Sequence, residues 1–367
     1  MQGSQTSGTG VPPVITQRHR IRTWKSWIAP AVLVAVAVTA LVAGLSGRGG
    51  SISSQRIYSG IGLPLVRLLI YLSIGLLVGQ MIESFGWSEK LGRWARPISG
   101  WAHLREESGA AFVSGFVSGI VANTLLMQYY LAGKLTRKEL ALTYLLNSGL
   151  PLYLVHLPTA FFVAASLAGS AGVLYISLNF LAALCRSAFV LVYCRYVLPR
   201  PHPSEASRPH GEQTASRPTV VRQIGRKFLD RFGRLVAYTV PVYLLVFLVN
   251  EWGFFLWMRT AIGSWISGEL FPVEAAGILI ATLAAEFSAG MAAAGALVQS
   301  GALTVKQTVL ALIAGTIVAT PIRAIRHQLP THAGIFSLGL GSELLALSQV
   351  LRIASLVVVA VPFLLLA

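Results

Sequence analysis

Charged residues are scarce in this sequence. They make up 11% of its 367 residues, whereas hydrophobic residues make up 54%, and the mean hydropathy is +0.68. A soluble globular domain carries roughly a quarter charged residues. Uncharged apolar runs of about 20 residues recur along the chain, which is the length that a helix needs to cross a hydrocarbon core of about 30 Å. The composition therefore excludes a soluble domain and predicts a polytopic membrane protein.

Cysteines and catalytic motifs are also few. The two cysteines, Cys185 and Cys194, lie in one apolar segment without a C-x-x-C spacing, which argues against a disulfide framework and a metal site. The sequence contains no nucleophile–base set, no G-x-S-x-G motif and no P-loop. We therefore expect no enzyme activity, no metal centre and no cofactor other than a coupling ion.

The net charge of +16 raises the question of nucleic-acid binding. Most Lys and Arg residues fall in short stretches beside apolar runs, as in loops that face an anionic cytoplasmic surface. No zinc-finger spacing or RNA-binding signature is present. We expect the lipid bilayer as a partner and no nucleic acid, and the sequence leaves a homo-oligomer open.

The N-terminal part is a polar and then basic arm followed by an apolar run. We assign residues 1–26 to a cytoplasmic arm and residues 27–56 to an extra transmembrane span. A cleaved signal peptide is the alternative, but the arm and the apolar run are both long for one. The expected location is the bacterial cytoplasmic (inner) membrane, with the N-terminus inside.

Residues 57–198 and 225–367 have the pattern of two copies of one helical unit, joined by a Pro-, Ser- and Arg-rich cytoplasmic linker at residues 199–224. Four landmarks recur in order and at a nearly constant shift. They are Arg67 and Arg234, Gly133 to Thr136 and Gly301 to Thr304, His156 and His327, and Arg186 and Arg352. Such an ordered set is hard to obtain by chance, so we infer a duplication.

Loop charge predicts how the two copies are inserted. In the first copy, a span at about 63–82 leads to an interfacial helix at 88–105 and an apolar stretch at 108–133. A full crossing of this last stretch would place the basic cluster after it outside, against the positive-inside rule, whereas a re-entrant hairpin keeps it inside. Each copy then makes an odd number of crossings. The predicted fold is all-α, with two inverted repeats that each contain a span, an interfacial helix, a re-entrant hairpin, a broken helix and a span.

Helix interruptions indicate where a site would lie. Interrupted helices expose backbone groups near the middle of the membrane, where a polar solute or an ion can replace water. Glu286, at the tip of the second hairpin, is the only strongly ionisable residue between Glu274 and Lys306. An unpaired carboxylate in such a run costs several kcal/mol. We expect it to coordinate a cation, a proton or the substrate, and the alternative is a neutral glutamic acid that caps a backbone break.

Other polar residues at the predicted breaks leave two roles open. Asn123, Asn147 and Ser148 either contact a ligand or satisfy backbone groups that the breaks free. Arg323 either pairs with Glu286 or an anionic group, or extends toward the cytoplasmic interface.

The order of hairpin, broken helix and span resembles the Gate (nucleoside recognition) domain family, which includes the membrane parts of ferrous iron transport protein B and of spore maturation proteins A and B. The supporting stretches are Phe112 to Asn123, Gly133 to Leu140, Leu145 to Ser148 and Glu286 to Ala294. The same order is similar to the transport core of concentrative nucleoside transporters, whose hairpin tips and broken helices hold substrate and sodium.

By position, this resemblance implies a site made of Asn123, Thr124, Asn147, Ser148, Glu286, Ser288 and Thr320, to which Arg323 is added from its place after Pro321. The first hairpin lacks the Gln/Thr/Glu cluster of the nucleoside transporters, which argues against a nucleoside as the substrate. The GTPase portion of the iron transporter is absent, so an ion gradient or a partner would supply the drive.

The sequence therefore predicts a secondary transporter or permease of a small solute, with the site between the two hairpins and Na+ or H+ as the coupling ion. The alternative is a non-transporting membrane scaffold that uses the same fold to bind a protein partner.

Overall fold

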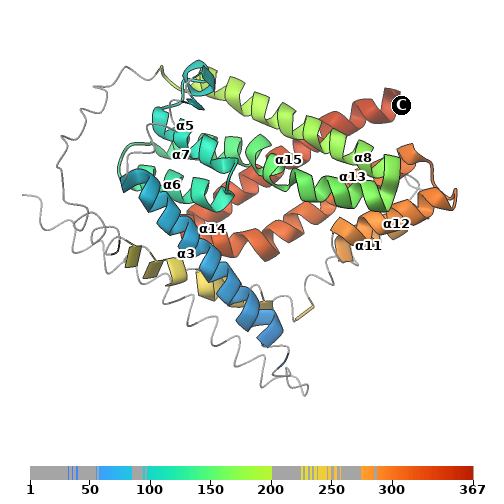
Figure 1. Ribbon diagram of the computed structural model, residues 1–367, viewed down its shortest axis with the longest axis horizontal. Helices are drawn as coiled ribbons and strands as arrows, with labels where there is room; N and C mark the ends of the chain where they lie inside the picture. Colours follow the sequence, from blue (N-terminus) through green and yellow to red (C-terminus); the bar gives the residue numbers. More distant parts are fainter. Residues whose placement is uncertain are drawn as a thin grey trace, which may run out of the picture.

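The computed structural model describes residues 58–84, 97–200, 274–284 and 287–366, with scattered positions at 32–55, 94–95 and 225–257. Within these residues every regular element is a helix (Figure 1). Three apolar helical segments are long enough to cross a membrane: Arg137–Val197, Val305–Phe336 and Leu338–Leu365. This agrees with the prediction of an all-α membrane protein. The N-terminal arm, most of the extra span, most of the linker and Glu286 lie outside the described residues.

The helix α3 (Leu63–Ser84) follows a short π-helical turn at Tyr58–Gly62 and covers the residues of the predicted span at about 63–82. Its apolar part, Leu63–Val78, is shorter than the three membrane-length segments. It packs against α6 (Gly119–Leu131). The contact is close, because a Cβ atom built on Gly75 would lie 2.3 Å from Ile120 Cγ2.

Part of the predicted interfacial helix at 88–105 is described, and residues 97–101 are helical. Trp94, Ile98 and Trp101 are exposed, and the opposite face is buried through Ala95, Ser99 and Ala102. Arg195 lies over the Trp101 ring, 5.0 Å from its centre, and donates to the Trp101 carbonyl at 2.9 Å. An exposed face with two tryptophans next to an arginine suits a helix at the membrane surface.

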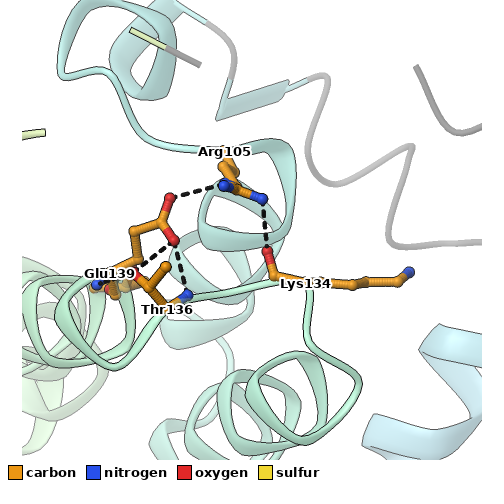
Figure 2. A network of polar contacts seen from close by, with 5 residues as sticks. Arg105, Lys134, Thr136 and Glu139 are labelled. Atoms are coloured by element: carbon orange, nitrogen blue, oxygen red, sulfur yellow. Dashed lines mark hydrogen bonds and ion pairs between the residues drawn. The ribbon is translucent and has the colours of Figure 1, made fainter. Parts of the chain in front are cut away.

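Two short helices, α5 (Glu106–Gly115) and α6, form the first hairpin. At 1.5 Å per residue they extend about 15 and 20 Å, which is less than a hydrocarbon core of about 30 Å. The residues just before α5 and just after α6 meet at one end. Arg105 donates to Glu139 Oε1 at 2.8 Å and to the Lys134 carbonyl at 3.1 Å, and both hydrogen bonds are drawn in Figure 2. The chain therefore enters and leaves this hairpin at the same end.

The second half repeats these elements. The helices α11 (Ala275–Ala284) and α12 (Phe287–Gln299) are 10 and 13 residues long, the same lengths as α5 and α6. After each hairpin the chain turns at a glycine with positive φ, 74° at Gly133 and 73° at Gly301, where a side chain would be strained.

The next helix begins in the same way in both halves. Thr136 caps α7 (Arg137–Asn147) in a capping box with Glu139, and Thr304 caps α13 (Val305–Arg323) in a capping box with Gln307. In each box the threonine hydroxyl accepts from the third residue of the helix, while that residue's side chain accepts from the threonine backbone. Two free N–H groups are thereby satisfied at each helix start.

The first helix break lies where the sequence predicts it. The helix α7 ends at Asn147, and α8 (Leu150–Val197) begins after Ser148 and Gly149. The backbone of α8 is interrupted at Gly169, with φ 55° and ψ −129°, so that a second arm runs back beside the first (Figure 1).

In the second half, the stretch from Thr316 to Pro321 also predicts a helix break, and this prediction is wrong in its position. The helix α13 continues through Pro321 to Arg323, and the irregular part is a π-helical turn at Ala324–Gln328. Proline removes one backbone donor, and a π-helical turn shifts the hydrogen-bond pattern without ending the helix.

The last two helices follow that π-helical turn. The short helix α14 (Leu329–Phe336) leads through Ser337, with φ 74°, to α15 (Leu338–Leu366). The apolar run predicts the last span at Leu344–Leu366, and in the structure this helix begins earlier, at Leu338.

Each hairpin packs against the chain reversal of the other half. The reversal of α8 places Ala164, Ala168 and Ala171 against Met291 and Ala294 of α12. Conversely, Phe336 and Leu344, on either side of Ser337, join the cluster of the first hairpin that contains Leu125 and Tyr129. The two halves therefore share their hydrophobic cores.

Candidate functional site

The break between α7 and α8 frees backbone groups, and the second arm of α8 satisfies two of them. The Leu150 N–H donates to Ser187 Oγ at 2.8 Å, and Arg186 Nη2 donates to the Ser148 carbonyl at 3.1 Å. The Ser148 hydroxyl donates to the Leu145 carbonyl of its own helix at 2.8 Å. The Ser148 hydroxyl therefore satisfies a backbone carbonyl at the end of α7, and its contact with a ligand stays a prediction.

Arg186 also connects the two halves of the chain. Its Nη1 donates to Ser355 Oγ of α15 at 3.2 Å, and Ser355 Oγ in turn donates to the Arg352 carbonyl at 2.8 Å. Arg186 is only 6% exposed, and its Nε has no hydrogen-bond partner among the described residues. The Nε–H of this buried guanidinium is therefore an unused donor.

Two further arginines lie beside Arg186. Arg352 lies one helical turn before Ser355, the residue of α15 that Arg186 binds, so the charges of Arg186 and Arg352 act on each other. Arg323, at the end of α13, acts on Arg352 in the same way. Arg352 and Arg323 are partly buried, and neither side chain makes a hydrogen bond or an ion pair with a described residue. We call Arg186, Arg323 and Arg352 the arginine cluster.

Hydroxyl groups of α8 and α13 border the arginine cluster. Tyr153 and Tyr175 both interact electrostatically with Arg352. The Tyr153 hydroxyl donates to the Ile176 carbonyl at 2.7 Å, and the Tyr175 hydroxyl shares a 2.7 Å hydrogen bond with Thr316 Oγ1. Thr320 is buried and donates to the Thr316 carbonyl at 2.6 Å. The predicted site residue Thr320 therefore lies one helical turn from a group that borders the cluster.

The arginine cluster has no carboxylate among the described residues. The two ion pairs that the described residues form, Arg105–Glu139 and Arg137–Glu343, lie at helix starts. A single arginine at the centre of a membrane costs about 2.5–3.5 kcal/mol on insertion scales unless it is compensated. The location therefore combines excess positive charge with unused hydrogen-bond donors.

The predicted residues of the first hairpin lie in different surroundings. Asn147 is 6% exposed, its Nδ2 is 3.5 Å from the Ala111 carbonyl, and its Oδ1 has no partner among the described residues. The Thr124 hydroxyl donates to the Ile120 carbonyl of its own helix at 2.7 Å, and Asn123 is partly buried. No hydrogen bond within the described part of the chain joins these three side chains to the arginine cluster.

In the second hairpin, Ser288 is exposed near the start of α12. Glu286 lies outside the described residues, so its predicted role stays a prediction. Among the residues that the structure does describe, no group of three His, Cys, Asp or Glu side chains could hold a metal ion.

Sequence reasoning did not select Arg186, Ser187, Arg352 or Tyr175 as site residues. A signal was available, because Arg186 and Arg352 are matched landmarks of the repeat and each lies within a long apolar run. Their proximity across the two halves is a property of the folded chain.

Comparison with known proteins finds relatives without a described function. The chain is similar to three uncharacterized proteins of Methanocaldococcus jannaschii. MJ0880 is 22% identical over 74% of this chain and 88% of its own length, MJ0871 is 23% identical over 78% and 89%, and MJ1556 is 22% identical over 77% and 89%. No protein-family model and no solved structure matches the chain. The resemblance to the Gate domain family, the bacterial inner membrane and the inside location of the N-terminus therefore stay predictions, and these three relatives are archaeal.

Proposed function

We propose that this protein is a secondary transporter or permease of a small polar solute. The observation that carries the proposal is the set of polar and charged groups around the α7–α8 break, which lies among apolar helices of both halves. Transporters place discontinuous helices near the membrane midplane, where free backbone groups and helix ends contact the solute. A membrane anchor without transport activity has no need of buried charges among its apolar helices.

The proposal includes two Gate-like units, inserted in opposite orientations. Both hairpins are too short to cross, and the base of the first is tied together at one end by Arg105. A hairpin that returns to its own side leaves an odd number of crossings in each unit. The recurrence of hairpin, glycine turn and threonine cap supports two copies of one unit.

Coupling to Na+ or H+ through Glu286 is part of the proposal. A carboxylate at the tip of the second hairpin would offer an oxygen ligand to a cation or a site for a proton. It would lie next to α12, which packs against the reversal of α8.

Water access to the hairpin tips tests transport against the scaffold alternative. Cysteines are introduced singly at Ser118 and Ser288 in a chain whose own Cys185 and Cys194 are replaced, and each variant is treated in vesicles with a membrane-impermeant thiol reagent. A transporter must expose its site to water in at least one state, so we expect one or both cysteines to react. Val358→Cys, at an exposed position of the apolar helix α15, is the matched control that should stay unreactive. A scaffold would leave both tips sealed, and that result would refute the proposal.

A further inference from the structure

The arginine cluster carries more positive charge than the described residues neutralise there. Arg186, Arg323 and Arg352 come from three different helices, and no carboxylate of the described residues pairs with them. Glu286, which lies outside the described residues, is the one acidic residue between Glu274 and Glu343. If Glu286 were ionised and paired with one arginine, two positive charges would remain without a partner among the described residues. Buried charges require compensation, so the excess calls for a negative group from outside the chain.

The unused donors of the cluster specify what that negative group must offer. Arg186 donates from Nη1 to Ser355 and from Nη2 to Ser148, while its buried Nε has no partner in the described part of the chain. The guanidinium groups of Arg323 and Arg352 form no hydrogen bond with any described residue. A guanidinium presents five donors in a planar fork that matches the oxygens of a carboxylate or a phosphate. An oxyanion would supply both the charge and the acceptors.

The helix break explains where Arg186 lies. Arg186 donates to the carbonyl of Ser148, the C-cap of α7, and the partial negative charge of a helix C-terminus favours a cation. At the start of the first arm of α8, the Leu150 N–H is satisfied by Ser187. The preference of the cluster for an anion therefore rests on its charge and its unused donors.

We propose that the transported solute carries an oxyanion group, a carboxylate or a phosphate-type group, which binds to Arg186, Arg352 and Arg323. This inference rests on the proposed transport function, because it names the substrate class of the same site. Arg186 is held in place by its two hydrogen bonds, and Arg352 and Arg323 offer free donors to the oxygens.

The test is ligand-induced stabilisation of the full chain in nanodiscs of neutral phosphatidylcholine. Acetate, succinate, phosphate and sulfate are added as sodium salts, with sodium chloride at equal ionic strength as the reference. We expect at least one oxyanion to raise the unfolding temperature saturably. Arg352→Gln removes no hydrogen bond of the described structure, so it should fold, and it should weaken the apparent affinity about ten-fold or more. Arg195→Gln, in the second arm of α8 but outside the cluster, should leave that affinity unchanged.

Each other result overturns the inference. Equal weakening by Arg195→Gln and Arg352→Gln would show non-specific binding of anions to a basic protein. Stabilisation by phosphatidylglycerol nanodiscs but by no soluble oxyanion would assign the cluster to a lipid headgroup. No saturable stabilisation by any of the four oxyanions would remove the oxyanion and leave transport standing. Conversely, sealed hairpin tips together with saturable oxyanion binding would refute transport and keep the anion site.

Discussion

Gly149 and Ser187 should be energetically coupled across the α7–α8 break. A Cβ atom built on Gly149 would lie 2.3 Å from Ser187 Oγ. The same Oγ accepts the Leu150 N–H at 2.8 Å. In Gly149→Ala the new methyl group must displace the Ser187 hydroxyl, so the hydrogen bond from the Leu150 N–H is lost. In Ser187→Ala the same hydrogen bond is lost directly.

The size of the coupling follows from that single shared bond. Leaving a buried backbone donor unsatisfied costs about 1–3 kcal/mol. Each single variant should include this loss, whereas Gly149→Ala/Ser187→Ala includes it only once. In the double variant the alanine methyl faces the Ser187 Cβ at 3.5 Å, which is an ordinary contact. The free energy of unfolding lost in the double variant should therefore be smaller than the sum of the two single losses by about 1–3 kcal/mol.

The assay is a double-mutant cycle of the free energy of unfolding, measured in mixed micelles by titration with a denaturing detergent. Ser177→Ala is the matched control, because the Ser177 hydroxyl is exposed and binds only the Val173 carbonyl of its own helix. Paired with Gly149→Ala, it should be additive within about 0.5 kcal/mol. If the Gly149 and Ser187 substitutions were additive to the same degree, the described geometry of the break would be wrong.

Two further substitutions test the packing of the halves and the base of the hairpin. Gly295→Ala should destabilise the protein by about 1–3 kcal/mol, because the added Cβ would lie 1.8 Å from the Leu167 carbonyl oxygen. The control Gly277→Ala, whose Cβ would meet nothing within 4 Å, should leave the stability unchanged or raise it. Equal shifts of the unfolding temperature in the two variants would contradict the close α12–α8 contact. Glu139→Ala removes half of a capping box and should lower the free energy of unfolding by about 1–2 kcal/mol. Glu139→Gln should lower it by less than about 1 kcal/mol, because Gln307 fills this position in the second half. Equal losses of the two variants in unfolding measurements would refute the capping role.

Local signals predict the parts of the fold that depend on a few neighbouring residues. The break at Gly149 appears where the sequence places it, and the repeat landmarks Gly133 and Gly301 both prove to be turns with positive φ. Each depends on a property of the residues themselves, such as a positive φ or a missing side chain. The charge of the loop that follows predicts the first hairpin as well, and its re-entrant insertion into the membrane stays a prediction.

The misplaced break at Pro321 has a physical reason beyond local sequence. Proline deletes one donor, but the chain can restore the pattern through a π-helical turn, and surrounding helices decide which outcome is more stable. Ser337 adopts φ 74° without being a glycine, so the start of α15 carries no glycine signal at all. Such positions are set by the packing of Phe336 and Leu344 against the first hairpin.

The arginine cluster shows most clearly why a site can escape sequence reasoning. The sequence argument favoured Glu286 because one ionisable group in an apolar run stands out, and the same argument applies to Arg186 and Arg352 taken singly. A single long arginine can reach the membrane surface, so it raises no demand for a ligand. In the structure Arg186 instead reaches Ser148 and Ser355 inside the protein. The demand for a negative partner arises only when the helices are assembled and the charges are counted together.

Duplication gives this like-charge pair a simple origin. In the proposed inverted arrangement, matched residues on inner helices approach each other where the two units meet. Arg186 and Arg352 are such a matched pair, and their charges do lie close together. A duplicated arginine near such an axis doubles the positive charge at one place, and it would destabilise the assembly unless a ligand or lipid supplied the negative charge. One arginine per unit, duplicated in this way, would therefore produce a site for an oxyanion. A neutral substrate would leave the repulsion between the two arginines uncompensated.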